Sequence, residues 1–227
     1  MRALYVGLAL VAGVLAGGRH AGAQEALYGA QPPKGSAYVR FVNATDSDIR
    51  LHPDFLPASQ LGPHDTDRVG AYFVVENVAG RALGFDVEAG ARKGHASVAA
   101  TPDGFLTIVV HQGADGGLAA TPIDDLAEFN QNRARLSFYN AAACDGGMLA
   151  LEPGGQAVFR DVPPDSSKAR AVNPANATLQ ASCGSAAAPP VDLSGVEAGS
   201  MFSVWLIDAG GRPNAFITRD IATPYKR

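Results

Sequence analysis

The chain contains little cysteine, few aromatic residues and no excess of basic charge. Of its 227 residues, 2 are cysteines and 7% are aromatic. Its 18 Lys and Arg residues are outnumbered by 22 Asp and Glu residues, which gives a formal net charge of −4 at pH 7. A general nucleic-acid binder needs a basic surface that neutralises phosphates, so this class of protein is excluded. The same balance argues against a module that binds anionic membrane surfaces.

Sequence motifs for nucleophilic catalysis, cofactor binding and metal binding are also missing. The chain has no Gly-x-Ser-x-Gly turn, no phosphate-binding glycine loop and no dinucleotide fingerprint. Two compact acidic clusters, 46–48 and 64–67, offer fewer than the roughly six to eight oxygen ligands that Ca²⁺ takes. The histidines of the mature chain are isolated in its first half. The sequence therefore predicts no catalytic residue, no cofactor and no metal site.

One long apolar run is present, at the start of the chain. Met1 and Arg2 precede the apolar segment 3–16, and small residues follow at 21–23. This order is typical of a secretory signal peptide, and the run is shorter than the roughly 20 residues of a membrane-spanning helix. We expect a signal peptide over 1–23 and a periplasmic mature protein that does not span a membrane. In that oxidising compartment, Cys144 and Cys183 are predicted to form a disulfide.

The mature sequence repeats itself. Residues 39–44 (VRFVNA) match residues 136–141 (LSFYNA) at an offset of 97 positions. Residues 104–110 match residues 201–207 at the same offset, which aligns Phe105 with Phe202. This pattern indicates a duplicated module with insertions in its loops. It also predicts core positions for the phenylalanines that recur, which are Phe41, Phe105, Phe138 and Phe202.

Short apolar or alternating runs bounded by Gly, Pro, Asn and Asp predict β-strands in both copies. Short strands at this spacing are typical of antiparallel sandwiches. The predicted strands are 36–43, 67–76, 82–88, 104–112, 134–140, 156–162, 177–182 and 201–208. The expected fold is all-β, with two tandem β-sandwich domains after the signal peptide. The expected division is an N-terminal arm at 24–34, a first domain at 35–120, a linker at 121–132 and a second domain at 133–227.

The start of the mature chain, residues 26–43 (ALYGAQPPKGSAYVRFVN), resembles the opening of the AlgF family. Members of this family are periplasmic accessory subunits of bacterial alginate O-acetylation. Their opening block has a Leu-Tyr-Gly-x-x-x-Pro-Lys-Gly-Ser-Ala-Phe-Val-Arg-like pattern, in which Tyr38 here takes the place of Phe. The block covers under a tenth of the chain. The cysteine pair and the 171–190 loop are not features of the best-known members.

The resemblance implies a non-catalytic adaptor required for O-acetylation of alginate or a related secreted polysaccharide. Its implied partners are periplasmic acetyltransferase subunits, a membrane-bound O-acyltransferase and the polysaccharide. Within the opening block, each residue has both a structural and a partner-binding interpretation. The candidate partner- or polymer-binding residues are Leu27, Tyr28, Pro32, Lys34, Gly35, Ser36 and Arg40.

Two alternatives to the adaptor remain. The first is a free-standing carbohydrate-binding module in which Tyr28, Tyr72, Tyr139, Trp205 or Tyr225 would stack on sugar rings. Trp205 lies within an apolar strand, which favours a core position. The second alternative is an acetyl carrier or acetyltransferase, which would become acetylated on a specific Ser or His.

Overall fold

The computed structural model describes residues 31–125 and 132–226. The predicted signal peptide and most of the predicted arm lie outside these ranges. The described part of the chain is nearly all β, with one short 3-10 helix, η1, at Asp65–Arg68. No helix in this part is long and apolar enough to cross a membrane.

The first half folds into two four-stranded sheets. The inner sheet has the order β4-β1-β7-β8, and the outer sheet has the order β3-β2-β5-β6. The strands are β1 (Ala37–Asn43), β2 (Ile49–Pro53), β3 (Ser59–Leu61), β4 (Phe73–Val75), β5 (Ala82–Ala89), β6 (Arg92–Ala99), β7 (Phe105–Gln112) and β8 (Leu118–Asp125). A buried core of aliphatic and phenylalanine side chains fills the space between the two sheets.

The second half repeats this plan. Its inner sheet has the order β12-β9-β16-β17, and its outer sheet is built from β11, β10, β13, β14 and β15. The strands are β9 (Ala134–Ala141), β10 (Gly147–Glu152), β11 (Ala157–Val162), β12 (Ser166–Val172), β13 (Ala177–Cys183), β14 (Ala186–Ala187), β15 (Val191–Leu193), β16 (Met201–Ala209) and β17 (Arg212–Arg219). The all-β sandwich prediction is therefore confirmed.

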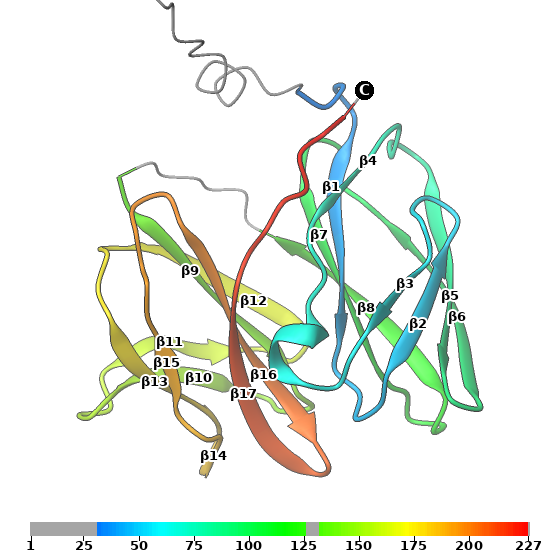
Figure 1. Cartoon of the computed structure of the whole chain (residues 1–227). Coiled ribbons are helices and arrows are strands. Elements are labelled where there is room, and N and C mark those ends of the chain that lie inside the picture. The colour runs from blue at the N-terminus through cyan, green and yellow to red at the C-terminus, as the bar shows by residue number, and fades with distance from the viewer. Residues whose placement is uncertain (1–30, 126–131, 227) are drawn as a thin grey trace, which may run out of the picture.

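The two inner sheets face each other, so the molecule has four layers (Figure 1). A third buried cluster lies between the inner sheets. It includes Val42 and Val109 from the first half and Tyr139, Trp205 and Phe216 from the second. This arrangement follows from the alternation of side chains along a strand, because the central strands of the inner sheets, β1, β7, β9 and β16, bury residues on both faces. Each inner sheet packs against its own outer sheet on one face and against the other half of the molecule on the other.

Several predicted elements need correction. The two strands at the centre of each inner sheet are parallel, not antiparallel. Parallel neighbours need a long crossover, which here passes through the outer sheet. The strand predicted at 67–76 is reduced to β4, with η1 before it. The predicted linker overlaps a strand, because residues 121–125 belong to β8 and pair with β7.

The predicted alignment of the two copies is wrong by one residue at β7 and β16. In the parallel pairs, Ile108 lies opposite Phe41 and Val204 lies opposite Phe138. Phe41 and Phe138 are 97 positions apart, but Ile108 and Val204 are 96 apart.

This shift changes the face on which one predicted core residue lies. Leu106, not Phe105, is the counterpart of Phe202, and both Leu106 and Phe202 lie in the cores of their own sandwiches. Phe105 is half-buried and stacks on Tyr38, with ring centroids 4.6 Å apart. Adjacent residues of a strand point to opposite faces, so a slip of one residue moves a side chain out of the core. The core positions predicted for the other three recurring phenylalanines are confirmed.

An asparagine performs the same task in each copy. The side-chain nitrogen of Asn43 donates to the carbonyls of Ser47 and Gly62, each at 2.8 Å. The side-chain nitrogen of Asn140 donates to the carbonyls of Cys144 and Val162, at 3.0 and 2.9 Å. Each asparagine therefore holds the loop that leaves its inner sheet for the outer sheet.

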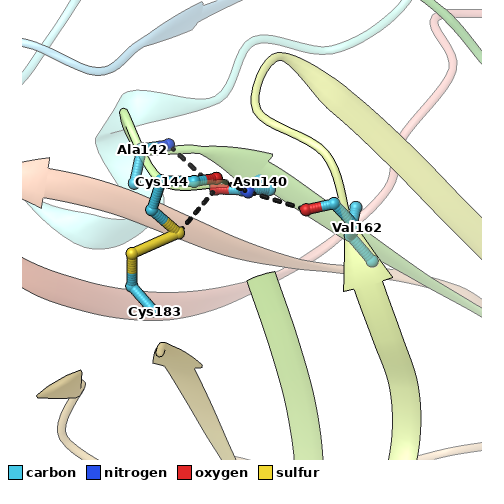
Figure 2. Close-up of a disulfide and its surroundings, with 5 residues drawn as sticks. All are labelled: Asn140, Ala142, Cys144, Val162 and Cys183. Atoms are coloured by element: carbon cyan, nitrogen blue, oxygen red, sulfur yellow. Dashed lines mark hydrogen bonds between the residues drawn. A yellow bond between two sulfur atoms is a disulfide. The ribbon is translucent and has the colours of Figure 1, made fainter. Parts of the chain in front are cut away.

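The second copy has an additional cross-link at this loop. Cys144 and Cys183 form the predicted disulfide, which joins the loop after β9 to the end of β13 (Figure 2). The disulfide thus lies beside the Asn140 side chain, within one sandwich.

Candidate functional site

The candidate site is the layer between the two inner sheets, and Arg40 lies at its centre. Arg40 projects from β1 on the face opposite the first core and is 1% exposed. Its Nη1 donates to Oδ1 of Asp220 at 2.7 Å, and its Nη2 donates to the hydroxyl of Tyr139 at 3.0 Å. Its Nε donates to Oγ1 of Thr107 at 2.8 Å. A single side chain of the first copy is thus bonded to both copies.

A second buried carboxylate, Asp125, completes the arrangement. Its Oδ2 accepts hydrogen bonds from Thr107 Oγ1 at 2.6 Å and from the Tyr72 hydroxyl at 2.7 Å. Its Oδ1 accepts one from the Tyr139 hydroxyl at 2.5 Å, which again links the two copies. In addition, Ser203 Oγ donates to the Asp220 carboxylate. We call these seven residues the interface network: Arg40, Tyr72, Thr107, Asp125, Tyr139, Ser203 and Asp220.

Aromatic rings surround the Arg40 guanidinium. Its Cζ lies 4.3 Å from the ring centroid of Tyr72, 5.4 Å from that of Tyr139 and 5.1 Å from that of Trp205. Burial alone would lower the pKa of Arg40, but Asp220 and the other network groups raise that pKa well above its ordinary value. Arg40 therefore remains charged inside the protein, held by a carboxylate and by ring faces.

Burial also keeps the two network tyrosines protonated. It is the largest effect on the pKa of Tyr72 and on that of Tyr139, and it raises both despite the opposing charge of Arg40. Both hydroxyls therefore stay donors, which is the form that Asp125 requires.

The network uses duplicated positions. Thr107 lies opposite Ile123 across the β7–β8 pair, and Asp125 comes two residues later. Ser203 lies opposite Thr218 across β16–β17, and Asp220 again comes two residues later. Each copy thus supplies a hydroxyl that donates to its own Asp.

Sequence analysis missed this pair of motifs. The hydroxyls are 96 positions apart and the aspartates 95, so a search of the repeat for polar positions would have found them. Asp125 was instead assigned to the linker. The structure makes it the last residue of β8, 8% exposed.

A polar cleft of about 540 Å³ opens where the two copies meet at the β16–β17 hairpin end. The first copy lines it with Asp46, Arg92 and His111, and the second lines it with Asp165 and Asp208. Three carboxylates face one guanidinium here, so the cleft repels a polyanion. No group of three or more potential metal ligands was found among the described residues.

His111 also contacts a hydroxyl. Its Nε2 lies 3.0 Å from Oγ1 of Thr121, and its Nδ1 lies 3.1 Å from the backbone carbonyl of Gln112. A carbonyl can only accept, so Nδ1 carries a proton, and in the neutral ring Nε2 then accepts from Thr121. This arrangement resembles a base beside a hydroxyl, with a backbone carbonyl at Nδ1 where a catalytic triad has a carboxylate.

The predicted binding residues of the opening block separate into three groups. Leu27 and Tyr28 lie outside the described residues. Lys34 is exposed and Pro32 is half-buried. Gly35 lies in a turn that the Ser36 amide closes by donating to the Pro33 carbonyl at 3.2 Å, and Ser36 is buried. The Gly35 amide donates to Asp103 Oδ1 at 2.9 Å, which holds this turn on the first sandwich.

Arg40 requires the clearest correction among these residues. It was expected to face a partner or solvent, but the structure buries it in the interface network. The reason is that the second sandwich covers the face of β1 that points away from the first core. The sequence did not reveal this interface. Arg40 therefore holds the two copies together instead of contacting a partner.

Three of the four described aromatic residues proposed for sugar stacking are also buried, and the fourth, Tyr225, is half-buried. Trp205, Tyr139 and Tyr72 are at most 4% exposed, which confirms the core position favoured for Trp205. The Tyr225 hydroxyl donates to Glu76 at 2.5 Å and ties the C-terminal segment to the first sandwich.

Comparisons with known proteins identify the family. Among solved structures, the chain is similar to a candidate cell adhesion protein from Bacteroides ovatus ATCC 8483, at 8% identity and a TM-score of 0.26. The match covers 87% of this chain and 100% of the other. No curated protein matches the chain. The family model described as "Alginate O-acetyl transferase AlgF" matches residues 9–202. The chain therefore belongs to the AlgF family, which acts in alginate O-acetylation.

Proposed function

We propose that this protein is a non-catalytic periplasmic adaptor of polysaccharide O-acetylation. In this role it would hold periplasmic acetyltransferase subunits near a membrane-bound O-acyltransferase and the polymer, while those partners perform the chemistry. Family membership supports the link to acetylation. The observation that carries the adaptor role is the interface network, which fixes the two copies as one rigid body.

Rigidity matters for an adaptor because it sets the distance between two bound partners. Hydrogen bonds from Arg40 to Asp220 and from Tyr139 to Asp125 cross between the copies in both directions. The side chains of Arg40 and Asp220 are 0% and 6% exposed, and a protein is strongly destabilised when a buried ion pair loses one partner. The two copies therefore move as one unit, and each surface keeps a fixed relation to the other.

The use of the network hydroxyls supports a structural role over a catalytic one. Thr107 and Ser203 both donate to carboxylates inside the protein, where solvent and an acyl donor have no access. A nucleophile needs a base and an accessible reacting atom. These hydroxyls serve stability instead.

A second candidate function rests on the contact between His111 and Thr121. An acetyl carrier would use Thr121 as the acceptor and His111 as the base. Incubation of the mature protein with an activated acetyl ester, followed by intact-mass measurement, tests this function. A mass gain of one acetyl group that disappears in Thr121→Val would favour the carrier, and an unchanged mass would eliminate it.

The adaptor role itself is tested by the acetyl content of the secreted polysaccharide. A strain lacking the gene is compared with a strain that carries a restored wild-type copy. We expect the deletion to remove acetyl groups while polymer yield stays constant, and the wild-type copy to restore them. Unchanged acetylation in the deletion strain would contradict the proposed function.

A further inference from the structure

The two exposed large hydrophobic side chains of the described chain lie at the same place. Phe73 on β4 is 42% exposed, and Ile221 after β17 is 63% exposed. The amide of Tyr72, next to Phe73, donates to the carbonyl of Ile221 at 2.8 Å, so the two segments are neighbours. Phe73 belongs to the first copy and Ile221 to the second. Exposed apolar side chains that gather in this way mark interaction sites more often than scattered ones do.

Two adjoining hollows lie beside these side chains. The larger, of about 380 Å³, is walled by Phe73, Leu56 and the edge strand β3. The smaller, of about 250 Å³, is walled by Ile217, Arg219 and Ile221. Both hollows are lined by Arg40, Gly70 and Ala71, so they adjoin, and the smaller one is also lined by residues 217–221 of the second copy. We call the two hollows together the seam groove.

The local backbone explains why the groove is open. Strand β4 pairs with β1 from Ala37 to Val39, and beyond that point the register shifts by one residue, so that Val69 bridges to Val42. Gly70 remains close to β1, where its amide donates to the carbonyl of Phe41 at 3.0 Å. A Cβ at Gly70 would lie in van der Waals contact with that carbonyl oxygen, at 3.4 Å, and with Leu61, at 3.8 Å. The missing side chain leaves the floor of the groove free.

The charges of the groove decide between a protein and a polyanionic polymer. Arg40 touches both hollows, but its side chain is 0% exposed and pairs with Asp220. The larger hollow therefore has no free cation to balance a uronate carboxylate, and burying an unpaired carboxylate is costly. The smaller hollow carries one exposed cation, Arg219. This combination suits an apolar side chain with a carboxylate nearby.

The edge of the outer sheet favours an extended ligand. Strand β3 is the outermost strand of the first outer sheet, and its residues Ser59 and Gln60 are exposed. A peptide in the extended conformation can add to such an edge, while its side chains enter pockets beside it. The larger hollow lies directly against β3.

We infer that the seam groove docks an extended segment of an acetylation partner protein, with an apolar side chain in the larger hollow and an acidic residue at Arg219. This inference rests on the proposed function and identifies the surface that performs it. Because the groove has walls from both copies, docking requires them in the arrangement that the interface network maintains.

The test measures binding of the purified periplasmic acetyltransferase subunits of the same strain to the immobilised mature protein. Phe73→Asp places a charge in the larger hollow, and Ile221→Asp places one in the smaller hollow. Arg219→Glu replaces the exposed cation of the smaller hollow with an anion. Ala99→Asp is the matched control, because Ala99 is exposed on β6 of the outer sheet. We expect about tenfold or greater loss of affinity for Phe73→Asp, as for a truncated anchor residue, and none for the control. Equal thermal melts of both variants exclude unfolding as the cause.

A photoreactive amino acid at position 73 or 99 in the producing strain identifies the occupant. Cross-linking at 73 to the same subunit, and none at 99, would support the inference. Cross-linking at 73 to polysaccharide, or equal affinities of Phe73→Asp and Ala99→Asp, would overturn it. The proposed function would survive either overturning result if the gene deletion still removes acetyl groups, so the two failures are distinguishable.

Discussion

The two copies share one strand order but differ at the positions that face each other. Where the first copy has Arg40, the second has Ser137, since both precede their asparagine by three residues. Where the first copy has Val42, the second has Tyr139. At these two positions the first copy contributes a cation and a small aliphatic side chain, and the second contributes a hydroxyl and a large ring. The two copies thus differ in sequence on the faces of the inner sheets that meet at the interface. Both sandwich cores keep the same pattern of apolar residues.

The comparison also shows which features cannot diverge. Each copy retains a hydroxyl that donates to an Asp, and each retains an asparagine at the inner-to-outer loop. These groups satisfy buried polar atoms of their own copy, so their loss leaves those atoms without partners. The single Arg40 then serves carboxylates of both copies, which is possible because the copies face each other.

The largest expected effect follows from breaking this asymmetry at Arg40. Arg40→Met leaves Asp220 and Asp125 buried without their cation, and we expect a loss of about 3–5 kcal/mol in the free energy of unfolding. Ser137→Ala is the matched control at the equivalent position. The Ser137 hydroxyl is buried and has no hydrogen-bond partner, so its removal should cost less than about 1 kcal/mol. Urea denaturation measures both, and equal losses would refute the assigned role of Arg40.

The disulfide distinguishes the second copy, and its removal should give the next largest effect. It closes a loop with a sequence separation of 39. The chain-entropy model gives about 4 kcal/mol for a loop of this length. We expect the double variant Cys144→Ser, Cys183→Ser to melt at a lower temperature than the wild type. Reductant should lower the wild-type melting temperature and leave that of the double variant unchanged. A reductant-insensitive wild type would argue against the disulfide.

The two asparagines test whether the copies keep equivalent roles. Asn43→Ala and Asn140→Ala each remove two hydrogen bonds from the asparagine side chain to backbone carbonyls, and we expect a loss of about 2–3 kcal/mol for each. In the oxidised protein the disulfide still anchors Cys144, so Asn43→Ala should be the more destabilising variant. Denaturation with and without reductant measures this difference. If Asn140→Ala lost more stability than Asn43→Ala in the oxidised protein, the equivalent roles assigned to the two asparagines would be contradicted.

Much of this fold could be predicted from the sequence, because apolar alternation specifies strands that have one face in a core. All eight predicted runs contain part of a strand. Among the strands that the sequence did not predict, β6 and β12 carry exposed charges such as Lys93 and Lys168, so their pattern is weak. The edge strands β8 and β17 contain prolines, which resemble loop signals.

The candidate site was much less predictable. Arg40 was identified by its family motif, but its burial depends on the packing of one sandwich on the other. No periodicity within a single strand reports such an interface, since both faces of β1 and β9 contain mixtures of apolar and polar residues. The duplicated hydroxyl and Asp positions were the one available signal.

The smallest expected effect concerns alkaline pH. Burial raises the pKa of Tyr72 and Tyr139 in the folded state, whereas an unfolded tyrosine titrates near pH 10. Their contribution to stability is therefore complete below about pH 10 and declines as the pH rises above it. We expect about 1 kcal/mol lost per tyrosine one pH unit higher. The double variant Tyr72→Phe, Tyr139→Phe should show a shallower decline in urea titrations, and an unchanged decline would contradict this explanation.

The most direct test of the central claim, that the two copies form one rigid body, uses Trp205. It is the single tryptophan of the chain, it is 0% exposed, and it lies between the inner sheets. Urea unfolding of the oxidised mature protein is followed by tryptophan fluorescence and by far-ultraviolet circular dichroism. We predict coincident transitions, because the interface cannot open while both sandwiches stay folded. A fluorescence transition at lower urea, with the β-sheet signal intact, would show that the copies separate and would contradict the account.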